Sequence, residues 1–426
     1  MNFCMIATFY PPYGFGGDAN FVRHLARELA ARGHEVDVVH CRDSYRTLGG
    51  AIPPAPNVRA EEGAEDGAED GAEDGAEDAL DADVTVHGLE SPFGALSPLA
   101  THQTGRPLFK TKRLRRILAK PFDVIHYHNP SLVGGAKVLQ YGRALKLYTF
   151  HEYWLVCPTN LLLRDGREPC EKRSCALCTI RQGRPPQWWR RVGLLRRSLA
   201  HVDAFFSPSR YAIGRHAELE LKAPVVHLPT FVPDGEPVAR VPQSDPYFLY
   251  AGRLEHGKGP QTLIEPFRRW GRARLVVAGA GAEEKRLREL AAGSDRIELL
   301  GHVPIDDLRK LYRNAIAVVV PSLTFELFPL VLLEAFREGT PVIVRNRGSL
   351  REAVADGGGG LVYDGDEEMI AQAARLLDDV RAREALGESG RIAFRTRWSA
   401  AAHVERYLGV IEELRESPRP VGAEAG

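Results

Sequence analysis

The stretch YFLYAGRLEHGKGPQTLIEPF, residues 247–267, joins a short apolar run to a helical pattern through a turn with three glycines. The apolar run is typical of a strand that is buried on both faces of a parallel sheet. Arg253 and Lys258 lie on the turn, directly before the predicted helix. A helix N-terminus favours anions, and Arg and Lys neutralise phosphate oxygens. We therefore interpret the turn as a diphosphate-binding loop. The alternative is a surface turn with solvated cations.

The same alternation of apolar runs and amphipathic stretches extends along the whole chain of 426 residues. It predicts α/β layers with more strands than one sheet usually holds, and therefore two Rossmann-like domains that face each other. Residues 229–245 contain four prolines and are expected to form the linker. The predicted strands are 3–9, 35–40, 84–88, 123–128, 146–150, 204–207 and 225–228 in the first half, and 247–251, 274–278, 297–300, 315–320, 341–344 and 360–363 in the second half.

These patterns divide the chain into an N-terminal domain over 1–235 and a C-terminal domain over 236–399. A helix over 400–415 is expected to pack back on the N-terminal domain, and the tail 416–426 is expected to be disordered. No run of about 18 apolar residues is present, and the N-terminus lacks the basic segment of a signal peptide. We therefore expect a cytoplasmic protein.

The acidic residues are unevenly distributed. Residues 63–78 repeat the tetrapeptide GAED, and the segment 61–83 contains twelve acidic residues and no Lys or Arg. Because like charges repel and little in the segment can be buried, we expect a disordered insertion; a calcium-binding or regulatory segment is the alternative. The remainder of the chain has 44 acidic against 56 basic residues. A positively charged body suits nucleotides, phospholipid headgroups or nucleic acid.

A second motif, PSLTFELFPLVLLEAFREGTPVIV, covers residues 321–344. It places Glu326 and Glu334 eight positions apart, near the start of a predicted buried helix. A carboxylate among apolar residues is costly to bury unless it is paired. Two acidic residues near a helix start can accept hydrogen bonds from sugar and ribose hydroxyls. The alternative is an acid at the helix dipole together with a buried salt bridge.

The two motifs occur in one order, with Gly252-Arg253-Leu254 and Lys258-Gly259 before the glutamate pair. With GTPVIV and Glu352 after the pair, the combination resembles the C-terminal domain of retaining glycosyltransferases of the GT-B fold, family 4 (glycosyl transferases group 1). The resemblance extends over essentially the whole chain. It implies that Gly252, Arg253 and Lys258 bind the diphosphate of a nucleotide-sugar donor, and that Glu326 and Glu334 bind its sugar and ribose.

Pro329 stands where many members of the family have glycine. Because proline has no N–H group, we expect any backbone contact to the donor here to come from Phe328 or Leu330. Residues 9–36, FYPPYGFGGDANFVRHLARELAARGHEV, resemble the family's first strand, glycine loop and first helix. The resemblance implies that Gly16 and Gly17 line the cleft near the donor phosphate and the acceptor and belong to the donor-binding residues. An ordinary turn between strand and helix is the alternative.

The segment TFHE, residues 149–152, matches a family motif whose histidine meets the donor sugar. His151 is therefore a candidate catalytic residue, although a single histidine at a strand end is often only a hydrogen-bonding residue. The resemblance implies a catalytic set of His151, Arg253, Lys258 and Glu326. Gly279-Ala280-Gly281 matches a dinucleotide-binding fingerprint only in part and is weak evidence for NAD.

The implied reaction moves a sugar from a UDP- or GDP-linked donor to a hydroxyl of a glycan, lipid-linked or small-molecule acceptor, with retention of anomeric configuration. It implies a role in polysaccharide or glycoconjugate biosynthesis and no required cofactor. Two alternatives stay open. One is a nucleotide-sugar epimerase of the same fold, and the more distant one is a nucleic-acid-binding protein with a four-cysteine metal knuckle, which salt-dependent binding would reveal.

Four cysteines lie within 22 residues with the spacing C-x12-C-x4-C-x2-C, namely Cys157, Cys170, Cys175 and Cys178. Four thiolates suit a structural zinc ion, and an iron–sulfur cluster is chemically compatible with the same set. Disulfides are disfavoured in a cytoplasmic protein. A set of unligated thiols is the alternative.

Residues 181–201 combine Trp188 and Trp189 with several arginines, and residues 110–120 form a second basic run. Aromatic residues beside a basic face suit the surface of an anionic membrane. This pattern predicts peripheral contact with the inner face of the membrane. A solvated helix face with its tryptophans in the core is the alternative.

Overall fold

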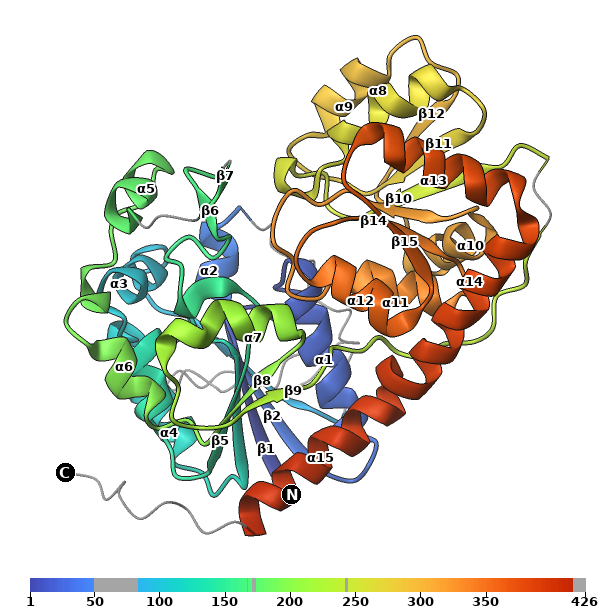
Figure 1. Ribbon diagram of the computed structural model, residues 1–426. Helices are drawn as coiled ribbons and strands as arrows, with labels where there is room; N and C mark the ends of the chain where they lie inside the picture. Colours follow the sequence, from blue (N-terminus) through green and yellow to red (C-terminus); the bar gives the residue numbers. More distant parts are fainter. Residues whose placement is uncertain (50–82, 167, 171–173, 242–243, 417–426) are drawn as a thin grey trace, which may run out of the picture.

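The computed structural model describes residues 1–49, 83–166, 168–170, 174–241 and 244–416, and it shows two α/β domains (Figure 1). The acidic insertion expected at 61–83 lies outside the described residues apart from residue 83. The tail expected from residue 416 onward lies outside them apart from Glu416. All predicted strands are present, with ends that differ by a few residues at most. The predicted α/β fold with two sheets is therefore confirmed.

The N-terminal sheet has seven parallel strands in the order β3-β2-β1-β4-β5-β8-β9. Alternate residues of the central strand β1 enter two different cores: Cys4 and Ile6 enter one, and Phe3 and Met5 enter the other. Burial on both faces explains why these strands are almost entirely apolar. The strands are β1 Asn2–Ala7, β2 Glu35–Cys41, β3 Thr85–Leu89, β4 Val124–Asn129, β5 Leu145–Thr149, β8 Ala204–Ser207 and β9 Val225–His227.

Helix α1 covers one face of this sheet because its residues Phe21, Leu25 and Leu29 form a buried stripe. A short hairpin of β6 (Leu163–Arg164) and β7 (Glu168–Pro169) was not predicted, since two-residue strands leave no periodic pattern. The helices of this domain are α1 Gly16–Ala30, α2 Arg42–Thr47, α3 Leu96–Thr104, α4 Thr111–Leu118, α5 Cys175–Arg181, α6 Leu194–Leu199 and α7 Arg210–His216, with single 3-10 turns at Tyr153–Leu155 and Trp188–Arg190.

The C-terminal sheet has six parallel strands in the order β12-β11-β10-β13-β14-β15. It also buries both faces. Its strands are β10 Tyr247–Ala251, β11 Arg274–Ala278, β12 Ile297–Gly301, β13 Val318–Val320, β14 Val342–Arg345 and β15 Gly360–Tyr363. Its helices are α8 Gln261–Trp270, α9 Glu284–Ala291, α10 Ile305–Asn314, α11 Leu330–Arg337, α12 Ser349–Gly357, α13 Asp366–Asp378 and α14 Val380–Ala393.

The last helix, α15 (Ala400–Glu416), leaves the C-terminal domain through a π turn at Phe394–Trp398 and lies on the N-terminal domain (Figure 1). Val404, Tyr407 and Ile411 are fully buried in the core that contains Phe3 and Phe21. The hydroxyl of Tyr407 is 3.0 Å from Nδ1 of His126 on β4. The chain thus passes between the domains twice, through the linker and through α15.

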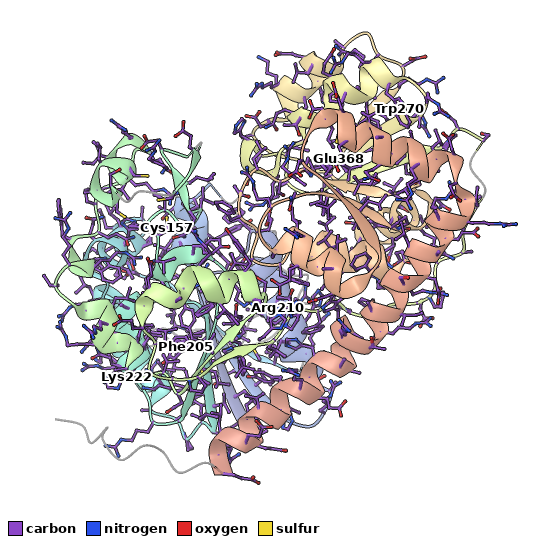
Figure 2. All side chains as sticks on the ribbon, in the orientation of Figure 1. Cys157, Phe205, Arg210, Lys222, Trp270 and Glu368 are labelled. Atoms are coloured by element: carbon purple, nitrogen blue, oxygen red, sulfur yellow. The ribbon has the colours of Figure 1, made fainter. Side chains whose placement is uncertain are left out.

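A group of polar contacts also joins the two domains. The carboxylate of Glu352, on α12, accepts hydrogen bonds from the backbone N–H groups of Arg210 (2.8 Å) and Tyr211 (2.9 Å), at the start of α7. The Arg210 guanidinium donates to both oxygens of Asp356, at 2.6 and 2.7 Å. Figure 2 shows Arg210 at the junction of the domains. We call Arg210, Glu352 and Asp356 the interdomain clamp, because a carboxylate at a helix N-terminus satisfies otherwise unpaired N–H groups.

We expect Glu352→Gln to lower the free energy of unfolding by about 1–2 kcal/mol, the usual effect of losing a carboxylate cap at a helix N-terminus. The amide can accept only one of the two N–H groups well and carries no charge. Urea unfolding measures the loss, and small-angle scattering measures whether the domains separate. Glu289→Gln, on the exposed surface of α9, is the matched control. Equal unfolding midpoints for the two variants would contradict this role of Glu352.

Candidate active site

The turn that follows β10 is held close to the neighbouring turn that follows β11. Gly252 N–H donates to the Ala278 carbonyl (3.0 Å), and Leu254 N–H donates to the Ala280 carbonyl (2.9 Å). A Cβ atom on Gly279 or Gly281 would collide with the carbonyls of Gly252 and Leu254, and both glycines have positive φ. Gly279 and Gly281, which partly match a dinucleotide fingerprint, therefore have a packing role. They let the turn of residues 252–254 lie against the turn that follows β11.

Lys258 and Glu326 form a direct ion pair. The Lys258 Nζ atom is 2.8 and 3.0 Å from the two carboxylate oxygens, and the Ser322 hydroxyl donates to the same carboxylate at 2.8 Å. Burial opposes the ionised form of Glu326, but Lys258 and Ser322 outweigh it and the pKa of Glu326 is lowered. The carboxylate is therefore ionised at neutral pH.

The loop that carries Glu326 is attached to the turn that carries Lys258. The backbone N–H groups of Leu323 and Thr324 both donate to the Gly257 carbonyl, at 2.9 and 3.1 Å. On the other side, the Ser349 hydroxyl donates to the Glu326 carbonyl at 2.7 Å. These hydrogen bonds thus hold the loop of Glu326 against the turn of Lys258 on one side and against the start of α12 on the other.

Arg253 lies half-exposed at the start of the same turn, and its Nη1 atom is 2.6 Å from Oε1 of Glu255. Burial raises the pKa of Asp18 and opposes ionisation of Glu326, and the positive charge of Arg253 favours the ionised form of both, so the guanidinium is near carboxyl groups of both domains. A Cβ atom built on Gly16 would lie 4.0 Å from the Arg253 guanidinium carbon. Arg253 therefore faces the glycine loop of the N-terminal domain.

Gly17 of the glycine loop and Leu330 of helix α11 also meet across the junction between the domains. A Cβ atom on Gly17 would lie 3.1 Å from Cδ1 of Leu330. Phe328 is buried in the core of the C-terminal domain and packs against Trp398, with ring centroids 5.9 Å apart. Any contact of Phe328 with a donor would therefore come from its backbone.

Glu334, which the resemblance assigns to the donor, has a protein partner in this structure. The Tyr312 hydroxyl, on α10, donates to Oε2 of Glu334 at 2.6 Å. Burial raises the pKa of Glu334, against the opposing effects of Tyr312 and Arg337. The structure thus brings Arg253, Lys258 and Glu326 together, whereas the described hydrogen bond of Glu334 goes to Tyr312.

His151 follows β5 and belongs to a group of buried imidazoles. Its Nε2 atom is 3.0 Å from Nδ1 of His128, and its ring centroid is 5.0 Å from that of Phe21. Burial, with a smaller effect of His403, lowers the pKa of His151 to about 3. His151 is therefore a neutral hydrogen-bonding group at pH 7 and carries no positive charge.

Sequence reasoning missed two partly buried carboxyl groups beside these residues. Asp18, in the first turn of α1, accepts a hydrogen bond from the Asn129 side chain at 3.2 Å. Glu152 accepts one from the Asn160 side chain at 2.7 Å. Burial and the Asp18 charge raise the pKa of Glu152 to about 8. The available signal was their position: Asp18 directly follows Gly17, and Glu152 directly follows His151.

The four clustered cysteines line one narrow cavity in the N-terminal domain, where Figure 2 labels Cys157. The Cys178 sulfur accepts hydrogen bonds from the Asp165 N–H (3.3 Å) and the Gln182 side chain (3.2 Å). Within the described part of the chain, no three His, Cys, Asp or Glu side chains are grouped so as to hold a metal ion. The predicted zinc or iron–sulfur site at Cys157, Cys170, Cys175 and Cys178 therefore has no support from the structure.

The two adjacent tryptophans have opposite environments. Trp189 is buried and donates from its indole nitrogen to the His102 carbonyl at 2.9 Å. Trp188 is 56% exposed, and the Arg191 guanidinium lies 5.0 Å from its ring centroid. Trp188 lines a cavity of about 390 Å³ that also includes Leu155 and Leu219. Among the described helices, none has the length and apolar character needed to cross a bilayer.

Two family models match the chain. Residues 15–236 match the model described as Glycosyltransferase Family 4, and residues 236–393 match Glycosyl transferases group 1. A relative named D-inositol 3-phosphate glycosyltransferase, from Arthrobacter sp. FB24, is 29% identical over 71% of this chain and 74% of its own length. A second relative, D-inositol 3-phosphate glycosyltransferase 2 from Catenulispora acidiphila, is also 29% identical, over 95% of this chain and 93% of its own length.

Solved structures agree in fold. Sucrose-phosphate synthase from Thermosynechococcus elongatus matches with a TM-score of 0.73 and 19% identity, over 97% of this chain and 99% of that chain. The Anabaena protein HepE in complex with UDP-glucose matches with a TM-score of 0.64 and 15% identity, over 97% of this chain and 100% of that chain. Since one family model covers more than half of the chain and the second continues to residue 393, the chain belongs to glycosyltransferase family 4 and is a glycosyltransferase with the GT-B fold.

Proposed function

We propose that this glycosyltransferase transfers a sugar from a nucleotide-diphosphate sugar to an acceptor hydroxyl with retention of configuration. The observation that carries the proposal is the ion pair of Lys258 and Glu326, with Arg253 beside it, on a turn that faces Gly16. Two cations before a helix suit a diphosphate, and a fixed carboxylate suits sugar hydroxyls. The UDP and UDP-glucose complexes of HepE support a UDP-linked donor, and GDP stays an alternative.

In the proposed reaction the bond between the anomeric carbon and the diphosphate oxygen breaks, and the acceptor oxygen bonds to the same carbon from the same face. The leaving diphosphate takes the acceptor's proton on a phosphate oxygen. Arg253 and Lys258 oppose the negative charge that develops on the leaving group. Because these two cations act on the departing phosphate, the protein need not supply an acid to release it.

Glu326 positions the sugar and does not attack it. Both of its carboxylate oxygens contact Lys258, and one also accepts from Ser322. A nucleophilic carboxylate would need a free oxygen directed at the anomeric carbon. His151, which is neutral at pH 7, contributes a hydrogen bond to the sugar. Glu334 binds the ribose through Oε1, since Oε2 accepts the hydrogen bond from Tyr312.

The acceptor side includes a surface that suits an anionic membrane. Residues 174–200 contain six arginines and no Asp or Glu. Leu177 and Ile180 on α5, together with Trp188 and Val192, are all about half-exposed or more. Apolar side chains beside arginines are typical of helices that lie in a membrane interface. We include peripheral membrane contact and a lipid-linked acceptor, in polysaccharide or glycoconjugate biosynthesis, in the proposed function.

The double substitution Arg253→Ala/Lys258→Ala should lower turnover of UDP-glucose by about 100- to 1,000-fold or more, because both charges on the leaving diphosphate are lost. Nucleotide release measures turnover, and circular dichroism checks that the variant stays folded. Lys285→Ala, on the exposed side of α9, is the control. A panel of UDP- and GDP-linked sugars in a thermal-shift assay identifies the donor first. Wild-type turnover in the double variant would rule out the proposed donor site.

The anomeric configuration of the product tests retention. With an α-linked donor such as UDP-glucose, we expect the first product to be the α-glycoside, since leaving and attacking groups share one face. The H1–H2 coupling of the transferred sugar, recorded by NMR on the glycoside product, distinguishes α from β. A β product would exclude the same-face reaction and leave the donor site unaffected.

Membrane contact predicts that the protein sediments with vesicles containing phosphatidylglycerol and not with phosphatidylcholine alone. Leu177→Ser/Ile180→Ser should reduce sedimentation at least severalfold, and added salt should weaken it. Leu290→Ser removes an exposed leucine from α9 and serves as the control. Equal sedimentation with both kinds of vesicle, or no loss in the double variant, would refute this surface.

A further inference from the structure

Glu152 and Asn160 form a buried polar pair with two oxygens left over. The Asn160 side-chain amide donates to Oε2 of Glu152 at 2.7 Å. The backbone N–H of Tyr153 donates to the backbone carbonyl of Asn160 at 3.3 Å. The remaining oxygens, Oε1 of Glu152 and Oδ1 of Asn160, are both buried and have no hydrogen-bond partner among the residues that the structure describes. Buried polar atoms without partners are costly. Two such atoms on one bonded pair indicate that a ligand group completes the site.

The pair lies beside the proposed reaction centre, on the side of the N-terminal domain. Glu152 follows His151 directly, and the charge of Asp18 acts on it. Asp18 in turn is near enough to Arg253 for the guanidinium to oppose the rise that burial causes in the pKa of Asp18. The neighbouring core around Tyr153 is covered by Phe325 and Leu327 from the loop of Glu326. The pair is thus placed opposite the donor-binding turn, where an acceptor has to enter.

We propose that Glu152 and Asn160 bind a hydroxyl of the acceptor, and that this acceptor group is a neutral polyol such as a sugar ring. The proposal rests on the proposed transfer reaction and specifies its acceptor side. One hydroxyl can accept a hydrogen bond from a protonated Oε1 and donate one to Oδ1 of Asn160, and would satisfy both leftover atoms. Glu152 and Asn160 are then acceptor-binding residues.

The charges around the pair favour a neutral group over a phosphate. Asp18 adds a carboxyl group beside Glu152, and His151 and His128 are uncharged at neutral pH because burial lowers their pKa values. Arg190 is near, but its guanidinium donates to the carbonyls of Trp154 and Leu155 at 2.6 and 3.2 Å. Among the described residues, Arg184 is the other cation whose charge acts on Glu152, and it is exposed, so a phosphate here would rely on a charge screened by solvent. A neutral acceptor group differs from the inositol 3-phosphate for which the two relatives are named.

The protonation state of Glu152 supplies a readout that a purely structural role would not. Burial and Asp18 raise its pKa to about 8, while Arg190, Arg184 and the Asn160 bond act in the opposite direction. Because Oε2 accepts from Asn160, the proton is carried on Oε1. The folded protein thus keeps Glu152 neutral between its ordinary value near 4.5 and about 8, whereas the unfolded chain ionises it. The stability from this group is complete below 4.5 and is lost as the pH rises towards 8.

Acceptor kinetics with UDP-glucose, or with the panel donor that gives the largest thermal shift, test the proposal. The acceptor probes are D-glucose and myo-inositol, each compared with its phosphate, glucose 6-phosphate and inositol 3-phosphate. We expect wild type to use the neutral compounds at least tenfold better. Glu152→Ala should raise their KM at least tenfold, with less than a twofold change in the KM of the donor.

Glu152→Gln presents an amide N–H where the acid presents Oε1–H, so we expect acceptor KM values within threefold of wild type at pH 7. The wild-type KM should change with a midpoint near pH 8, and the KM of Glu152→Gln should not. Above pH 8 this variant should also resist urea better than wild type. Glu168→Gln, on the exposed part of the same segment, is the control for both measurements.

Four results would overturn the proposal. The first is a preference for the phosphates over the neutral polyols, and the second is no use of either neutral polyol by a wild-type enzyme that turns over the donor. The third is an equal effect of Glu152→Ala on the KM of the donor and the KM of the acceptor. The fourth is loss of acceptor use in Glu152→Gln at pH 7. Failure of the proposed function is distinguishable, because the Arg253→Ala/Lys258→Ala variant would then turn over UDP-glucose like wild type.

Discussion

The ion pair between Lys258 and Glu326 is the interaction on which the rest of the candidate site depends. It joins a glycine turn after β10 to the loop before α11, two segments that are 68 positions apart in the sequence. Backbone hydrogen bonds to Gly257 hold the two segments together. A buried carboxylate without a cation would be neutralised or displaced. The pair therefore fixes both the charge and the position of the group that is proposed to hold the sugar.

A site shared by two domains also needs a fixed distance between them. The linker alone does not supply it, and two other features do. Helix α15 buries Tyr407 in the core of the N-terminal domain after leaving the C-terminal one. The carboxylate of Glu352 caps the start of α7 from α12. Neither feature uses the side chains of the candidate site, so those side chains can contact a substrate.

The two sides of the junction differ in charge. The donor side carries Arg253 and Lys258, which suit a diphosphate. The proposed acceptor side carries Asp18 and Glu152, and burial raises the pKa values of both carboxyl groups. In the proposed reaction, such a division would separate an anionic leaving group from a neutral acceptor, since each would find complementary groups on its own side. Oε1 of Glu152 and Oδ1 of Asn160 give the proposed acceptor side two adjacent positions for hydrogen bonds to a ligand.

The sequence by itself determined the strands, the two-domain α/β fold and the turn of Arg253 and Lys258, because strand burial and glycine turns leave local, periodic patterns. Tertiary structure decided which distant residues meet. It paired Glu334 with Tyr312, buried Trp189 while exposing Trp188, and left the cysteines without a grouped metal site in the described residues. It also placed Glu152 beside Asp18. Such pairings depend on how separate strands are ordered in a sheet, and residue spacing along the chain does not encode that order.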